Sequence, residues 1–175
     1  MQGSNVVQIL LTKHFKKYLM NETTSLPIST TQKRMFAFVI DDIVVVLLLL
    51  SIFYEQLMVI ASHLPTVLTE EALNAFQEEI NQFSADNLLI VVSLKVLYHT
   101  IFVWQNGMTL GKYIMKIKVI DLDVLDTPTL PKAFFRALVR IGSEVIFYLG
   151  FLLAFFSPLK QTLHDKLSNC VVIDA

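Results

Sequence analysis

Cysteine is almost absent from this 175-residue chain, which contains Cys170 alone. A single cysteine cannot form an intrachain disulfide, and it excludes a metal site built from several thiolates. Lysine and arginine are missing from residues 62–87, although that stretch carries five acidic residues. The formal net charge of the whole chain is −1, so the sequence gives no reason to expect nucleic-acid binding.

Patterns typical of enzymes are also missing. No Ser-His-Asp or Cys-His arrangement has a spacing that indicates catalysis, and His164 followed by Asp165 is more typical of a capping and hydrogen-bonding pair. The segment from Gly107 to Lys112 has three residues between its glycines, where a phosphate-binding loop needs four, and Tyr113 where that loop needs Ser or Thr. We therefore expect no catalytic residues, no metal site, no cofactor and no enzymatic activity.

Apolar sequence is what the chain has in excess, with 54% hydrophobic residues. These residues are concentrated in three blocks, at about 35–61, 88–104 and 134–157, each long enough to form a membrane segment. We predict an all-α integral membrane protein with about three membrane segments, in which residues 34–175 form the membrane domain. The lipid bilayer is then the main surrounding of the protein.

The distribution of lysine and arginine predicts the orientation of these segments. Residues 1–34 contain five such residues and residues 105–133 contain four, whereas residues 62–87 contain none. Basic residues are enriched in cytoplasmic loops of membrane proteins. We therefore expect a multi-pass protein of the inner cell membrane, with the N-terminus and residues 105–133 in the cytoplasm and residues 62–87 outside.

Two segments outside the membrane blocks show a helical period. Residues 1–33 predict a basic N-terminal helix at about 5–20 and a linker, and that helix would lie either on an anionic membrane surface or on a partner. In the outer loop, Thr69 is a suitable N-cap for a helix that starts with Glu70 and Glu71. An apolar stripe then predicts an amphipathic outer helix with one face formed by Leu73, Phe76, Ile80 and Phe83.

Residues 113–120 and 170–174 predict a small β element, because both are short runs rich in Ile and Val. The side of the membrane on which residues 158–175 lie stays open. A straight third segment would place them outside. Pairing of the two strands would instead return them to the cytoplasm and make residues 134–157 a re-entrant pair of half-helices, broken near Gly150.

Charged side chains interrupt all three apolar blocks. Such groups are costly in hydrocarbon, so we expect them to face one another inside the bundle. A rise of about 1.5 Å per residue places them at two depths from the cytoplasmic end of each helix, about 9–11 Å and about 14–17 Å. The predicted polar cluster comprises Asp41, Asp42, His99 and Arg140 at the shallower depth, and Lys95 and Glu144 at the deeper one.

The matching depths predict specific pairs. We expect Asp41 and Asp42 to neutralise Arg140, with His99 beside them, and Lys95 to pair with Glu144. These pairs either belong to a functional site or serve only to offset the desolvation of buried charge.

Three short motifs make the chain similar to the RDD family of small membrane proteins. They are, in chain order, Arg34 with Asp41; Gly107, Thr109, Gly111 and Lys112; and His164 with Asp165. The resemblance covers about 34–60 and 88–174, with Asp42 as an additional acid and Ser168-Asn169-Cys170 where the family usually has Ala-Gly-Thr. It implies an integral membrane domain, with transport or sodium–proton exchange suggested for some members, and it implies that Asp41 is held ionised by Arg34 or Arg140.

Two functions follow as expectations. The first is transport of a monovalent cation or proton along a path that a homo-oligomer or a membrane-protein partner completes, since three spans are few for a carrier. In this case Asp42 is the carrier of the proton or cation and Asp41 is structural. The alternative is a non-catalytic accessory subunit that assembles or stabilises a larger membrane complex.

Overall fold

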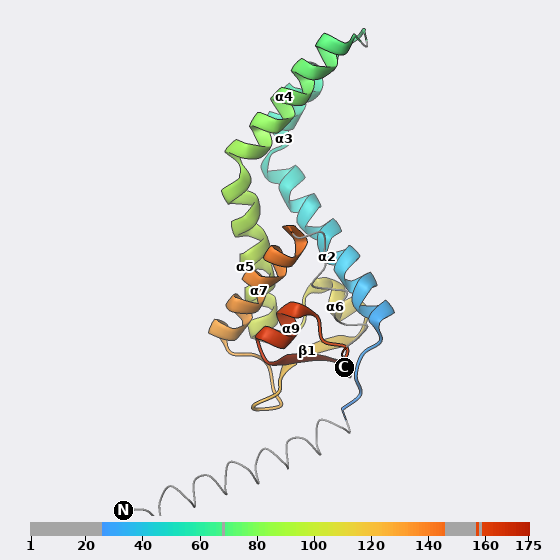
Figure 1. Ribbon diagram of the computed structural model, residues 1–175, viewed down its shortest axis with the longest axis vertical. Coiled ribbons are helices and arrows are strands. Elements are labelled where there is room, and N and C mark those ends of the chain that lie inside the picture. The colour runs from blue at the N-terminus through green and yellow to red at the C-terminus, as the bar shows by residue number, and fades with distance from the viewer. Residues whose placement is uncertain (1–25, 68, 146–156, 158) are drawn as a thin grey trace, which may run out of the picture.

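The computed structural model describes residues 26–67, 69–145, 157 and 159–175, and its main feature is a pair of long helices, α2 (Thr31–Ile52) and α5 (Leu88–Asn106) (Figure 1). Each is long and apolar enough to cross a membrane. Only 17% of the most apolar part of α2 and 28% of that of α5 is buried within the protein. The core helix of a water-soluble domain would bury far more of such a surface, so both helices are suited to a lipid environment.

The N-terminal end of α2 is set by Thr30, whose side chain accepts a hydrogen bond from the backbone N–H of Lys33 at 3.3 Å. Along this 22-residue helix, about 33 Å long, the buried residues are Ala37, Asp41 and Val45. Their spacing of four places them on one narrow stripe. Apolar side chains of the other faces, such as Leu47 at 57% exposure, are left open to the surroundings.

The predicted first segment, residues 35–61, is divided at Phe53 into α2 and α3 (Tyr54–Ser62). Phe53 is 6% exposed, and its ring packs edge-on against that of Phe83 at 5.5 Å between centroids. The division separates a helix of membrane-spanning length from a shorter one that carries Glu55 in its first turn.

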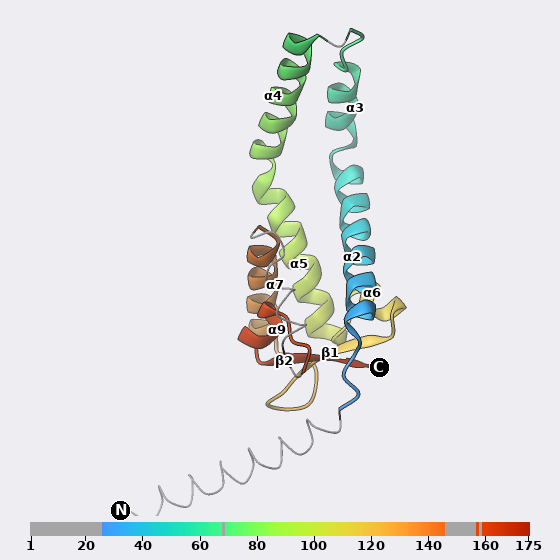
Figure 2. The same ribbon diagram turned by 45° about the vertical axis from the view of Figure 1, so that its right-hand side comes forward.

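The predicted amphipathic helix that starts with Glu70 is confirmed as α4 (Glu70–Asp86). Thr69 accepts a hydrogen bond from the N–H of Ala72 at 3.3 Å, and Glu70 and Glu71 occupy the first turn. Figure 2 shows α3 and α4 side by side as a hairpin that prolongs the α2–α5 pair. The imidazole of His63 lies 2.8 Å from the carboxylate of Glu79 and links the two helices.

The other end of the α2–α5 pair carries the remaining elements: α6 (Leu110–Ile114), β1 (Ile117–Asp121), α7 (Leu130–Val145), α9 (Leu163–Leu167) and β2 (Cys170–Asp174) (Figure 1). The two strands pair antiparallel, with Ile117 opposite Asp174 and Asp121 opposite Cys170. The predicted strand 113–120 starts too early, because Tyr113 and Ile114 belong to α6 and the chain turns at Lys116, where φ is +54°.

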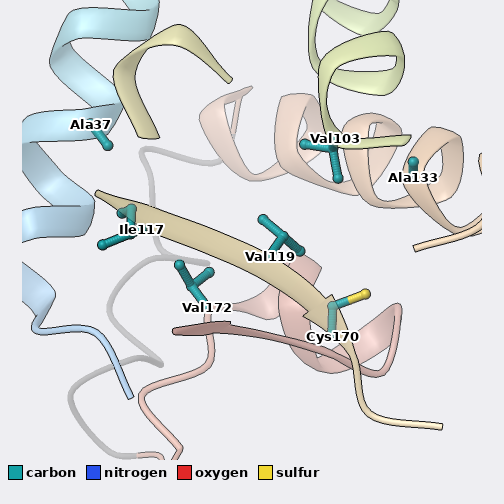
Figure 3. Packing of buried hydrophobic residues seen from close by; sticks show 7 residues of the cluster. All are labelled: Ala37, Val103, Ile117, Val119, Ala133, Cys170 and Val172. Carbon is teal, nitrogen blue, oxygen red and sulfur yellow. The ribbon is translucent and has the colours of Figure 1, made fainter. Parts of the chain in front are cut away.

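A small apolar core holds the sheet against the helices. Its members are Ala37, Val103, Ile117, Val119, Ala133, Cys170 and Val172 (Figure 3). Three of them come from α2, α5 and α7, so one short sheet fastens three helices at the same end.

Strand pairing also places the C-terminal tail. Because β2 lies beside β1, residues 170–174 are at the same end of the molecule as the loop between α5 and α7, as the alternative with paired strands predicted. The expected break near Gly150 lies outside the described residues, as does the expected N-terminal helix at 5–20. Within the third predicted segment, α7 begins at Leu130 rather than near Phe134.

Candidate functional site

Asp41 is the most enclosed carboxylate of α2, with 0% exposure. Its Oδ1 accepts hydrogen bonds from the hydroxyl of Tyr98 and the N–H of Gly111, both at 2.8 Å. Its Oδ2 accepts one from the hydroxyl of Thr109 at 2.6 Å, and the ammonium of Lys112 lies 3.6 Å away. Through these donors and this cation, one buried carboxylate joins α2 to α5 and α6.

Glycine is required at two positions around this carboxylate. At Gly111, an added Cβ would collide with the carbonyl oxygen of Ala37, so the close approach of α6 to α2 depends on it. Gly107 ends α5 with φ +69°, a left-handed conformation that favours glycine. A Cβ there would also lie 2.7 Å from the carbonyl oxygen of Val119.

Asp165, at 1% exposure, is the centre of a second buried cluster of hydrogen bonds and ion pairs. Arg136 donates to its Oδ1 from Nε at 3.0 Å and from Nη2 at 2.5 Å, and Nη1 of Arg34 lies 3.4 Å from Oδ2. Oδ2 also accepts from the N–H and hydroxyl of Thr162, which completes a capping box at the start of α9. Burial alone would raise the pKa of Asp165, but Arg136, His164 and Arg34 together hold it below its ordinary value.

Arg34 connects the cluster around Asp165 to the sheet. Its guanidinium donates to the hydroxyl of Ser29 at 2.7 Å and to the carbonyl oxygens of Lys160 and Val172 at 2.5 and 2.8 Å. Arg34 therefore belongs to the cluster around Asp165 and not to the one around Asp41, although Arg34 and Asp41 lie on nearly the same face of α2. The prediction that Arg34 holds Asp41 ionised is wrong.

The third group is a row of charges between α2, α5 and α7. Lys95 donates to Glu144 at 2.8 Å, which confirms the predicted pair, and also lies 3.7 Å from Asp42. Arg140 donates to Glu144 from Nε at 3.2 Å, and its Nη1 lies 3.1 Å from Nδ1 of His99. His99 is thus beside Arg140, as expected.

The predicted neutralisation of Arg140 by Asp41 and Asp42 is wrong. Glu144, four residues further along the same helix, is the carboxylate that pairs with Arg140. Asp41 has the same depth as Arg140, but it points toward α6 and takes Lys112 as its cation. The two charges contact adjacent residues of α5, Tyr98 and His99, in agreement with the predicted equal level, whereas sequence spacing could not give the rotation of α2 about its own axis.

Two site residues were missed by the sequence reasoning. Tyr98 was given no role, although its position one residue before His99 already placed it at the depth of Asp41. Arg136, which lies four residues before Arg140, was not predicted to bind Asp165. No sequence signal linked residues 29 positions apart across the third apolar block.

Lys112 is the cation with the most perturbed environment outside the apolar helices. Burial, and to a smaller extent the nearby Arg136 and Arg140, lower its pKa to about 7 against the opposing effects of Asp41 and Asp165. Within the described part of the chain, no group of three or more His, Cys, Asp or Glu side chains is placed to hold a metal ion.

The three sequence motifs therefore meet in space. The first supplies Arg34 and Asp41, which bind the third and the second motif respectively. A model of the RDD family matches residues 28–169, the part of the chain that contains all of these contacts. This chain belongs to the RDD family. Family membership and the two apolar helices together make it a membrane protein.

One curated relative is a protein of Rickettsia prowazekii (strain Madrid E) that is described as uncharacterized protein RP437. It is 35% identical to this RDD protein over 89 residues, which is 51% of this chain and 47% of the relative. The chain thus spans about half the length of the relative it matches. No solved structure matches this chain.

Proposed function

We propose that this RDD protein is a non-catalytic accessory subunit of a larger membrane complex. In this proposal α2 and α5 cross the inner membrane, the N-terminus and the β1–β2 end are cytoplasmic, and the third apolar segment is re-entrant. The α3–α4 hairpin projects on the outer side and binds another membrane protein.

The observation that carries this proposal is the lack of burial in the hairpin. Neither α3 nor α4 contains a buried residue. Large apolar side chains are exposed on α3, among them Tyr54 at 62%, Met58 at 55% and Val59 at 56%. Beyond the hydrocarbon region such a surface is unfavourable in water, and a partner would cover it.

Spaces along the hairpin also support a partner. A cavity of about 350 Å³ opens between the helices, lined by Leu49, Phe53, Leu57, Phe83 and Val91 among others. A second, of about 400 Å³, lies beside Val59, Ile60 and Phe83 and is also lined by Gln56, Glu79, Gln82 and Asp86. Spaces of this size between helices are suitable for side chains of another protein.

The motif contacts support a structural role as well. Asp41 and Asp165 have several donors each, and each motif contact joins two elements of the fold. Groups held in this way rigidify a scaffold, which is what an assembly subunit requires.

The decisive experiment is photo-crosslinking from the hairpin in intact membranes. A photoreactive amino acid at Met58 should crosslink to one protein species. The matched control places it at Leu47, which is equally exposed but lies on the apolar α2, and should react with lipid. Removal of the RDD protein should then lower the amount of the crosslinked species. A purified protein that stays monomeric in mild detergent and gives no protein crosslink at Met58 would rule out this function.

A second function, transport of a monovalent cation or proton, is favoured by the row of charges. Asp42, Lys95, Glu144 and Arg140 form a connected series of close contacts, and the Asp42 side chain is 31% exposed. Replacement of Asp42 by Asn should abolish pH-gradient-driven cation flux in reconstituted vesicles without unfolding the protein. If the wild-type protein, alone and with its partner, moves no alkali cation, the transport function is excluded.

A further inference from the structure

A small cavity of about 30 Å³ lies where the three motifs meet, between α2, α6, α7 and the β1–β2 end. Among the described residues, its charged lining consists of Arg34, Lys112, Arg136, Arg140 and Asp165. The five side chains are each at most 9% exposed. Four cations thus face one space with a single carboxylate.

The surrounding carboxylates do not balance this charge. The contacts around Asp41, the contacts around Asp165 and the row of charges between α2, α5 and α7 can be counted together. They contain five cationic side chains (Arg34, Lys95, Lys112, Arg136 and Arg140) and four carboxylates (Asp41, Asp42, Glu144 and Asp165). When Lys112 is protonated, one positive charge is therefore in excess in a mostly buried cluster. Buried charge is unfavourable unless it is compensated.

One of the cations also has an unused donor. Arg140 is 3% exposed, and among the described residues nothing accepts a hydrogen bond from its Nη2. Its other nitrogens are engaged by Glu144 and His99, while Phe38 stacks on the guanidinium at 4.8 Å. A buried donor without an acceptor is rare in proteins and indicates that a small particle occupies the space.

We propose that this cavity binds one small inorganic anion of the size of chloride, held by Arg34, Lys112, Arg136 and Arg140. The anion neutralises the excess positive charge and supplies the acceptor that Arg140 lacks. A volume of about 30 Å³ admits one or two water-sized particles, which excludes phosphorylated metabolites and lipid headgroups. This site is independent of the accessory function, because it lies at the opposite end of the molecule from the hairpin (Figure 2).

Burial is the main cause of the low pKa of Lys112, about 7, and the neighbouring Arg136 and Arg140 contribute to it. A bound anion would favour the protonated ammonium and raise this pKa. The anion would thereby strengthen the contact of Lys112 with Asp41 and tighten α6 against α2.

The test uses the full-length protein in an uncharged detergent without anionic lipid. Thermal unfolding is followed while sodium chloride replaces sodium gluconate at constant ionic strength, so that general screening does not change. We expect the melting temperature to rise with the chloride concentration in the way that binding to a single site predicts. The ³⁵Cl resonance should broaden in the presence of the protein, and bromide should reverse the broadening.

Two variants assign the response to this cavity. Arg140→Lys keeps the charge but removes the unused donor, and should weaken chloride binding by about tenfold or more. Lys116→Gln removes an exposed cation away from the cavity and should leave the response unchanged.

Equal melting temperatures in chloride and gluconate, with no ³⁵Cl broadening, would show that the cavity contains water and would overturn the proposal. An undiminished chloride response in Arg140→Lys would overturn it too, because the anion would then bind elsewhere. If Arg140→Lys does not fold, the ³⁵Cl measurement on the wild-type protein decides alone.

Discussion

Replacement of Asp41 by Asn tests the central contact of the fold. In the variant, the oxygen of the Asn amide must take the place of Oδ1, because the N–H of Gly111, 2.8 Å from Oδ1, can only donate a hydrogen bond. The amide nitrogen of Asn then faces Thr109, whose hydroxyl oxygen already accepts a hydrogen bond from Lys112 at 3.1 Å. The variant therefore loses the hydrogen bond that the Thr109 hydroxyl donates, weakens the others and leaves Lys112 without its carboxylate.

The expected loss of stability follows from these contacts. A hydrogen bond to a charged group contributes about 1.5–3 kcal/mol, and removal of one member of a buried ion pair costs about 3–5 kcal/mol. The contacts share one carboxylate, so their values do not add. We expect the free energy of unfolding to fall by about 3–5 kcal/mol, a large part of the ~5–15 kcal/mol that is typical of a folded domain.

The matched control is Asp42→Asn, one residue along the same helix. The Asp42 side chain is 31% exposed, and its contact with Lys95 is long, at 3.7 Å. We expect this change to cost less than about 1 kcal/mol. Both variants are compared with the wild type by unfolding in mixed detergent micelles, followed by far-UV circular dichroism. Similar losses for the two variants would refute the assignment of Asp41 as the structural carboxylate.

Three further changes examine other parts of the fold. Gly111→Ala should prevent the close approach of α6 to α2 and lower the yield of folded protein, whereas Gly142→Ala, where nothing lies within 4 Å of an added Cβ, should be neutral or stabilising by up to about 1 kcal/mol, as measured by thermal unfolding. Lys95→Met or Glu144→Gln alone should be destabilising, and a double-mutant cycle should give a coupling of about 0.5–3 kcal/mol; purely additive losses would contradict the 2.8 Å contact. A cysteine at Gln77, introduced after replacement of the native Cys170 by Ser, should react with an impermeant maleimide in intact cells, and protection there would reverse the proposed orientation.

Helical periodicity and capping were sufficient to predict much of the local structure. The Thr69 cap placed the start of α4 correctly, and the run of apolar residues placed α2 and α5. The pair of Lys95 and Glu144 was also predicted correctly, because helical rise converts sequence position into depth with little error. Each of these inferences needs only the geometry of a single helix.

The partner of Asp41 was decided by the tertiary structure alone. Asp41 and Arg140 lie at similar depth, yet α2 is rotated so that Asp41 points toward α6, where Gly111 lets the two backbones meet. The same holds for Asp165 of α9, which contacts Arg136 of α7 at the end of the molecule where β2 pairs with β1. Helical rise sets the depth of a side chain, but the rotation of each helix and the return of the chain depend on how all elements pack together, and no local pattern records that.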